Sequence, residues 1–566
     1  MDRNEDQPER GVHEALDAYL TRGLSRRVFL QRTGLLGLGA VASASVLAAC
    51  TSSSPAAQSS GTGSTPAGTP KTGGTFREGY DRDFTPPDPV ANSWADPTFN
   101  AFWEALAIRD PAGTLVPMLA DSFKSTDTGW TFQLRNGLKF HNGVDCTAAV
   151  VAKDFTIYAG KVKSIPAQNG IFWTPITEIT ASGQTVTCAT KKPFQAFQET
   201  VGTEYSYIID PDARAKAGKD WGSKVIVGTG PFTLGEYVPG QHVTAKKWPD
   251  YPGSNVPFFA NKGKAYVDVV EWVPITQASQ RAPEITTGSV DAVKNVPPQD
   301  IASLKSNADL VVQEFQELSN FFLFLNPAKT QYGFDDLAVR QGISAAIDRN
   351  AIVQSIFLGH AKPTFGPYMP GYKWYDSGVE QFNQFDTGKA ASLLDGAGWT
   401  KGSDGIRAKN GNQLAFEVFN LTDEVENQVL QAVSQMLGAV GVKMTVTSLA
   451  DTAFYPKLAP TTTAYAFKWL WSSPIDVVQI FGTAQSPADY VTTKKLDELY
   501  ATFQTAGSPA ELATAAKAYS VYFAENVPYI PIYTPNTVWV NHKRVVGWSP
   551  NQVNLYPFYN DVWLAG

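Results

Sequence analysis

Apolar and polar residues alternate in several short stretches of the chain, as they do in β-strands that are buried on one face. Between residues 130 and 135 the apolar side chains are Trp130, Phe132 and Leu134, and polar residues separate them. Asn136-Gly137 follows directly and predicts a tight turn into a return strand that starts at residues 138–140. The stretch therefore predicts a β-hairpin.

Other stretches have the period of an amphipathic helix. Val339, Ile343 and Ile347 recur at every fourth position within residues 335–358, and Gly359 predicts the end of that helix. Because helices and strands are interleaved, the pattern indicates α/β lobes. Further predicted elements are helices at 389–394, 426–437 and 512–524, and strands at 186–188 and 442–446.

The N-terminal 49 residues differ, because residues 28–49 form a nearly continuous apolar run. The run overlaps Ser25-Arg26-Arg27-Val28-Phe29-Leu30, which resembles a twin-arginine export signal, and leads into Leu47-Ala48-Ala49-Cys50, which resembles a bacterial lipobox. These motifs predict that residues 1–49 are removed and that Cys50 carries a lipid anchor. A transmembrane helix is the alternative, but Gly and Ser residues dilute the run.

Residues 51–74 are mostly Ser, Thr, Pro, Gly and Ala, and such a segment buries too little apolar surface to fold. We therefore expect a flexible linker at 50–74 and a folded part that begins near Thr75. The chain after residue 49 is too long for one hydrophobic core, so two or more domains or lobes are expected.

Composition and motifs narrow the function. The net charge of −7 makes the chain a poor candidate for binding nucleic acid. It has no Gly-x-Ser-x-Gly, His-Glu-x-x-His or phosphate-binding Gly-x-x-x-x-Gly-Lys motif, so neither a hydrolase nor an ATPase is indicated, and no cofactor or metal ion is expected. In an exported protein, Cys146 and Cys188 form either a disulfide or two buried thiols, and the sequence leaves both possibilities open.

A series of motifs spans residues 75–566 in a characteristic order. Together they resemble the family 5 extracellular solute-binding proteins, the group that includes oligopeptide-, dipeptide- and nickel-binding proteins of ATP-driven importers. Gly230 in one motif is expected to supply a turn, and His141 to be structural. The motifs are Asp88-Pro89, Leu115-Val116-Pro117-Met118-Leu119-Ala120-Asp121-Ser122-Phe123, the hairpin region through Ala148, Gly228-Thr229-Gly230-Pro231-Phe232, Gly288-Ser289-Val290-Asp291, Phe324-Leu325-Asn326, Val339-Arg340-Gln341-Gly342-Ile343, Ala346-Ile347-Asp348-Arg349, Ala397-Gly398-Trp399 and Pro528-Tyr529-Ile530-Pro531-Ile532-Tyr533.

The resemblance implies an α/β fold of two lobes, the type II fold of large, cluster C-like periplasmic binding proteins, with an inserted subdomain in lobe I. Lobes of this kind close on a solute by rotating about a hinge. The implied boundaries are 75–320 for lobe I with its subdomain near 107–225, 321–527 for lobe II, 528–566 for the return to lobe I, and hinge crossings near 321–326 and 526–533.

The resemblance also marks Lys468–Asp476 as part of the ligand site. In the peptide-binding relatives a tryptophan of this region is followed three residues later by an aspartate that pairs with the α-ammonium of the peptide. If Trp469 is that tryptophan, Ser472 stands in place of the aspartate, and a hydroxyl does not replace a carboxylate beside a desolvated ammonium. Either Asp476 takes this role from a shifted loop, or the solute has no free amino terminus there.

Trp469 and Trp471 offer flat apolar faces to a peptide side chain or a sugar ring; the alternative is that they belong to the core of lobe II. Weaker candidates for the ligand site lie where the resemblance places the cleft and the hinge, and each has a structural alternative. They are Arg82, Asp83, Phe322, Asn326 and Tyr368.

The sequence thus predicts an extracytoplasmic, lipid-anchored, monomeric receptor that is not an enzyme. It would bind oligopeptides and deliver them to the permease and ATPase subunits of an ABC importer. An oligosaccharide or another neutral solute is the alternative ligand, because Ser472 replaces the expected carboxylate. An exported lipoprotein hydrolase and a signalling receptor that does not deliver its solute are the alternative functions.

Overall fold

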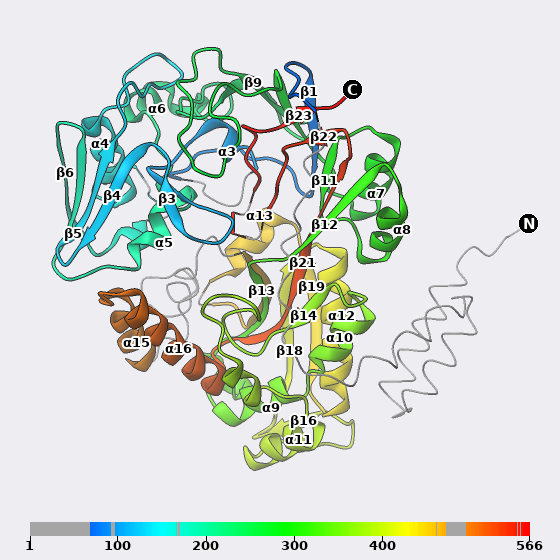
Figure 1. Cartoon of the computed structure of the whole chain (residues 1–566). Helices are drawn as coiled ribbons and strands as arrows, with labels where there is room; N and C mark the ends of the chain where they lie inside the picture. The colour runs from blue at the N-terminus through cyan, green and yellow to red at the C-terminus, as the bar shows by residue number, and fades with distance from the viewer. Residues whose placement is uncertain are drawn as a thin grey trace, which may run out of the picture.

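The computed structural model describes residues 68–91, 97–165, 167, 170–459, 461–470, 494–551, 553–554 and 556–566. The predicted export signal, Cys50 and most of the predicted linker lie outside these residues. The elements form an upper and a lower group in Figure 1, here called lobe I and lobe II. One twelve-stranded sheet runs through both lobes in the order β19-β18-β20-β13-β21-β11-β1-β10-β9-β8, and β12 and β14 also pair with β21. The α/β class predicted from the sequence is confirmed.

In lobe I, β1 (Thr75–Tyr80) lies between β10 (Val269–Pro274) and β11 (Ala292–Lys294) and is parallel to both. The antiparallel strands β9 (His242–Lys247) and β8 (Phe232–Val238) extend this sheet to its edge. On one side, α7 (Ala278–Thr287) and α8 (Ile301–Ser306) bury apolar side chains against β11 and β21. Shorter elements of this lobe are α3 (Phe99–Phe102), β2 (Ala107–Arg109), β3 (Leu115–Pro117), β22 (Val545–Val546) and β23 (Trp563–Leu564).

A second sheet of lobe I lies on the opposite side in Figure 1, in the order β4-β5-β7-β6. Its strand β5 (Gly129–Leu134) buries Trp130, Phe132 and Leu134, as predicted. The predicted hairpin partner at 138–140 is wrong, because β4 and β7 occupy both edges of β5. The other elements are β4 (Ala120–Thr126), β6 (Ile176–Ser182), β7 (Thr185–Thr190), α4 (Ala148–Tyr158), α5 (Phe197–Val201) and α6 (Pro211–Ala217).

Lobe II is built on β13 (Ser319–Leu325), whose side chains alternate between two cores. Phe321, Leu323 and Leu325 face one core with α9–α12, and Phe322 and Phe324 face the other with α16. The sheet continues through β20 (Ala464–Leu470), β18 (Ala415–Leu421) and β19 (Lys443–Leu449). Other elements are α11 (Thr387–Gly396), α12 (Glu424–Ala439), α13 (Asp451–Phe454), α15 (Lys494–Gln504), α16 (Pro509–Asn526), β15 (Thr400–Lys401), β16 (Arg407–Lys409) and β17 (Asn412–Gln413).

The helix predicted over residues 335–358 is two helices, α9 (Leu337–Ala345) and α10 (Arg349–Ser355). The break has a local cause, because the Asp348 side chain accepts a hydrogen bond from the Ala351 backbone amide and caps a new N-terminus. The three other predicted helices are confirmed as α11, α12 and α16. None of the helices among the described residues has the length and apolar character needed to cross a membrane.

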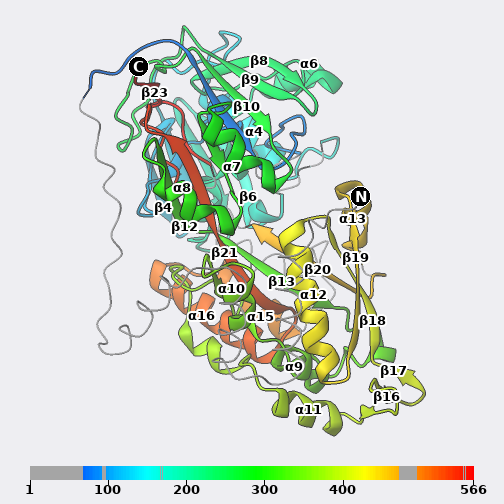
Figure 2. The same ribbon diagram turned by 90° about the vertical axis from the view of Figure 1, so that its right-hand side faces the viewer.

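The strand β21 (Ile530–His542) joins the lobes. Its first half pairs with β13 and β14 (Ala361–Pro363) of lobe II, and its second half pairs with β11 and β12 (Leu310–Gln316) of lobe I. Figure 2 shows β21 running as one long strand from the upper group into the lower group. The chain also passes between the lobes at Glu317-Leu318, between β12 and β13. The exact lobe boundaries stay a prediction.

Candidate ligand-binding site

Charged side chains of both signs gather where the two lobes meet. Lys468 of lobe II places its Nζ 3.4 Å from a carboxylate oxygen of Glu317. Burial raises the pKa of Glu426 to about 8, and Asp423 adds to this, while Lys468 and Arg82 oppose it from the two lobes. The set, here called the cleft charges, comprises Asp81, Arg82, Lys294 and Glu317 from lobe I and its connection to β13, and Asp423, Glu426 and Lys468 from lobe II.

Two cleft carboxylates have their own protein partners. Burial opposes the ionisation of Asp81, but Lys294, Arg82 and Arg281 and a 2.6 Å hydrogen bond from Asn295 Nδ2 lower its pKa. Burial likewise opposes the ionisation of Glu317, and its pKa is lowered by Lys468 and Lys294 and by a 2.5 Å hydrogen bond from Ser319. Both groups therefore stay ionised at neutral pH.

Lys294, at the end of β11, is surrounded by aromatic rings. Its side chain is only 3% exposed, and Nζ lies 5.1 Å from the ring centre of Tyr556, 5.5 Å from Trp539 and 5.8 Å from Tyr80. Such ring faces attract a cation. Burial lowers the pKa of Lys294, and the charges of Asp81 and Glu317 oppose that effect.

A hollow of about 320 Å³, including its part open to solvent, lies beside this lysine between the lobes. Leu470 at the end of β20 forms part of its wall, and the chain continues from there into residues 471–493, which lie outside the described residues. The candidates Trp471, Ser472 and Asp476 fall in that segment. Residues that line the hollow include Lys294, Gln316, Glu317, Leu470, Trp539 and Asn554.

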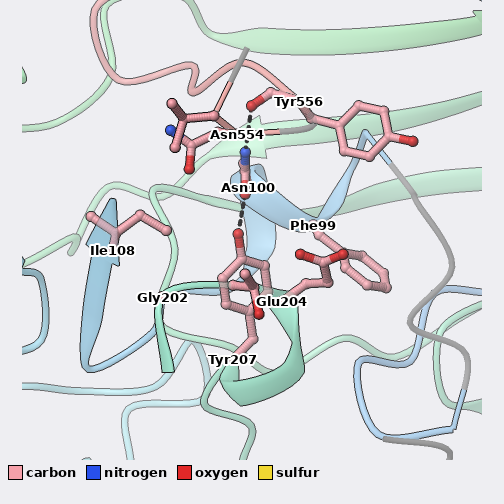
Figure 3. Close-up of a pocket in the computed structure, with 10 residues that line it drawn as sticks. Phe99, Asn100, Ile108, Gly202, Glu204, Tyr207, Asn554 and Tyr556 are labelled. Carbon is pink, nitrogen blue, oxygen red and sulfur yellow. Dashed lines mark hydrogen bonds between the residues drawn. The ribbon is translucent and has the colours of Figure 1, made fainter. Parts of the chain in front are cut away.

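A second hollow of about 390 Å³ lies in lobe I, and Asn554 lines both hollows. Figure 3 shows Asn100 in its wall between Tyr556 and Tyr207. Asn100 Nδ2 donates to the Tyr556 backbone oxygen over 2.9 Å, and the Tyr207 hydroxyl donates to Asn100 Oδ1. Asn554 is thus the lining residue that the two hollows share.

Of the residues expected near the cleft from lobe I, Arg82 lies with the cleft charges. Its side chain is 51% exposed and lies 3.7 Å from Asp81. Asp83 has structural hydrogen bonds instead, since its carboxylate accepts from the backbone amides of Phe84 and Gly240. A ligand role for either residue stays a prediction.

The candidates on the lobe II strands and loops lie in packed surroundings. Phe322 and Tyr368 are buried among aromatic rings, and Trp469 is buried edge-on against Phe467 at 4.9 Å. Asn326 is also buried, and its side chain donates to Thr462 O and accepts from the Ala328 amide. The structure thus gives these four residues structural contacts, and a ligand role for them stays a prediction.

Lys294, Gln316 and Glu317 were not predicted from the sequence. Lys294 follows two apolar residues in a short strand, and Glu317 lies in the two-residue link between β12 and β13, so neither stands out from ordinary surface residues. The sequence signal that could have indicated Lys294 is its position directly after Ala292-Val293, next to the Gly-x-x-Asp motif at residues 288–291.

Other sequence expectations concern structural side chains. Cys146 and Cys188 are buried free thiols rather than a disulfide, and burial raises the pKa of both. His141 is structural as expected: Nδ1 accepts from the Gly228 amide, and burial lowers its pKa to about 4. The described residues contain no cluster of metal-binding side chains.

The family model of bacterial extracellular solute-binding proteins, family 5, matches residues 114–492. The match covers more than half of the chain and extends over parts of both lobes. The chain belongs to this family. Its members are extracellular or periplasmic, and the relatives below are substrate-binding proteins rather than enzymes. This family 5 protein is therefore a substrate-binding protein of an ABC importer.

The glutathione-binding protein GsiB of Salmonella typhimurium is 26% identical to this family 5 protein over 490 residues, which cover 84% of this chain and 89% of GsiB. The oligopeptide-binding protein AppA of Bacillus subtilis, solved with a nonapeptide, has a TM-score of 0.76 at 21% identity, covering 88% of this chain and 100% of AppA. A dipeptide-binding protein of Pseudoalteromonas sp. SM9913, solved with Met-Leu, has a TM-score of 0.75 at 17% identity, covering 87% and 100%. These likenesses confirm the predicted two-lobe fold.

Proposed function

We propose that this family 5 protein captures oligopeptides between its lobes and delivers them to the permease of its importer. The cleft charges carry the proposal, because a peptide brings an ammonium, a carboxylate and often charged side chains to the same site. A buried ionised group such as Lys294, for which no carboxylate of the described residues lies within ion-pair distance, is costly to enclose unless the ligand supplies its partner. A neutral sugar offers no such partners.

The relatives support the same substrate class. GsiB is named for glutathione, and AppA and the Pseudoalteromonas protein were solved with a nonapeptide and with Met-Leu. We further propose that the export signal directs this receptor out of the cytoplasm, and that lipid-modified Cys50 then holds it at the outer face of the membrane. Trp471, Ser472 and Asp476 remain proposed ligand contacts, because they follow Leu470 at the edge of the hollow.

Native mass spectrometry of the purified full chain, followed by denaturation, tests the proposal. We expect peptides to be released and a peptide digest of casein to rebind with a dissociation constant near micromolar, which corresponds to roughly −8 kcal/mol. Calorimetry of the emptied protein with the digest and with a mixture of neutral oligosaccharides measures the preference directly. Binding of sugars but not of peptides would show that the neutral-solute alternative is correct.

A further inference from the structure

We propose that Lys294 and Gln316 form an anion subsite that receives a carboxylate of the bound peptide. The inference rests on the proposed function and deepens it, because it predicts that the solute carries an anionic group on the hinge side of the cleft. Both residues line the hollow between the lobes, one from β11 and one from the end of β12.

The Lys294 ammonium is surrounded by aromatic rings and can still bind an acceptor. An ammonium has three N–H donors, and the faces of Tyr80, Trp539 and Tyr556 attract the charge without supplying conventional acceptors. Nζ makes no hydrogen bond or ion pair within the part of the chain that the structure describes, although the side chain is 97% buried. A buried cation without an acceptor is costly, so an anion from outside is its natural partner.

The carboxylates near Lys294 have other partners. Glu317 accepts hydrogen bonds from Ser319 and Thr537 and lies 3.4 Å from Lys468. Asp81 accepts from Asn295 and lies beside Arg82. Neither carboxylate is within ion-pair distance of Lys294, which therefore keeps its capacity to bind an anion.

The same hollow contains a second hydrogen-bond donor. Gln316 Nε2 is buried and has no hydrogen-bond partner among the described residues, although it lines the hollow together with Lys294. A carboxylate has two oxygens that accept hydrogen bonds from an ammonium and an amide at the same time, and such charge-assisted bonds are short and strong. The pair thus fits a carboxylate better than it fits a hydroxyl of a sugar.

The experiment compares casein digests with free and with methyl-esterified carboxylates on the full chain. We expect the esterified digest to bind at least tenfold more weakly to the wild-type protein. Lys294→Met should remove this preference, and Lys294→Arg should retain it because the positive charge remains. Lys246→Met, at an exposed position of β9 in the same lobe, is the matched control and should behave like the wild type.

A synthetic peptide chosen from the captured pool then identifies which carboxylate is bound. It is made as the free acid, as the C-terminal amide, and with its acidic side chains replaced by their amides. The carboxylate whose replacement by an amide lowers the affinity is the group bound at Lys294. If peptides bind but neither esterification nor Lys294→Met changes their affinity, Lys294 is only a structural cation and the inference is wrong while the proposed function stands. If no peptide binds, both fail together.

Discussion

At Gly230 the backbone of α3 passes so close that no side chain fits. A Cβ at this position would lie 2.4 Å from the carbonyl oxygen of Ala101 and 2.6 Å from the carbonyl carbon of Phe102. Both are backbone atoms. A hydrogen bond also joins Gly230 to this segment, because the Gly230 amide donates to Phe102 O over 3.0 Å. The glycine therefore fixes the contact between α3 and the start of β8.

Gly230→Ala should reduce the free energy of unfolding by about 1–3 kcal/mol, the usual cost of forcing extra atoms into a packed region. Denaturant unfolding of the full chain measures the change. Gly396→Ala in α11 is the matched control, because its Cβ would meet no atom within 4 Å, and it should leave stability unchanged or raise it by up to ~1 kcal/mol. Equal effects of the two substitutions would contradict the steric argument.

The sequence identified Gly230 through its motif but did not reveal why a glycine is needed there. A turn was expected and the chain bends at Thr229-Gly230, but the φ of Gly230 lies outside the left-handed region, and glycine is required by the close approach of a distant segment. Such a requirement depends on residues that lie far away in the sequence, so a local pattern does not reveal it. The same limit applies to Lys294, whose aromatic neighbours come from three separate segments.

At the scale of elements, Glu314 of β12 connects the strands around the hinge. Its carboxylate accepts a 2.6 Å hydrogen bond from Asn536 of β21 and lies 2.7 Å from His360 Nδ1, just before β14, and 3.0 Å from Lys305. Burial works against the charged form, but these partners together lower the pKa of Glu314 to about 2. The ionised glutamate thus holds β12, β14 and β21 together.

Because the folded-state pKa of Glu314 is below its ordinary value of 4.5, its stabilising effect is complete above about pH 5 and disappears as the pH falls toward 2. We expect Glu314→Gln to be less stable than the wild type at pH 7, and the difference to shrink between pH 4.5 and 2. Thermal unfolding at a series of pH values measures it. Glu178→Gln, at an exposed position of β6, should show no such trend; a constant difference for Glu314→Gln would refute the linkage.

Most helices were predicted well from the sequence, and the pairing of strands was not. The positions of α11, α12 and α16 are confirmed, and glycines near the ends of the first two indicated where they stop. The predicted hairpin after β5 does not form, because β4 and β7 already pair with the two edges of that strand. The single helix predicted over residues 335–358 is interrupted at Asp348, because the side chain of this residue caps a second helix despite the continuing apolar spacing.

At the scale of the whole molecule, the lobes also touch on the side away from the hinge strands. Glu199 of α5 in lobe I is 1% exposed and lies 2.5 Å from Arg109 of the same lobe and 2.7 Å from Lys373 of lobe II. Nearby, the Gln195 amide donates to Ala506 O, at the end of α15, over 3.1 Å. These contacts, here called the tip contacts, join lobe I to lobe II.

We expect Lys373→Met to weaken peptide binding by up to about fivefold, because a half-exposed ion pair contributes at most ~1 kcal/mol to the closed arrangement. Global stability should change little, since Arg109 still pairs with Glu199. Calorimetry measures the affinity, and small-angle scattering measures whether the free protein becomes more extended. Lys224→Met, which removes a pair within lobe I, is the control; identical affinities for both variants would argue against a role of the tip contacts in closure.

The sequence and the structure point to the site through different residues. The sequence placed it in the segment after β20, whose ligand role stays a prediction, and Leu470 at the end of β20 lines the hollow. Arg82 and Lys468 lie in segments that were expected at the cleft. The other cleft charges were missed, because Asp81, Glu317 and Glu426 are ordinary polar residues until two lobes bring them together. A ligand site formed between lobes has no single stretch of sequence that encodes it.

The strand shared by the two lobes has a consequence for how the protein is made. Residues 530–542 lie between β13 and β11, so they complete the central sheet on both sides. During synthesis every other strand of that sheet is made before them, and until the ribosome has passed residue 542 each lobe exposes an unpaired strand edge. We therefore expect that neither lobe finishes folding alone, and that the nascent chain needs protection from aggregation until β21 has been made.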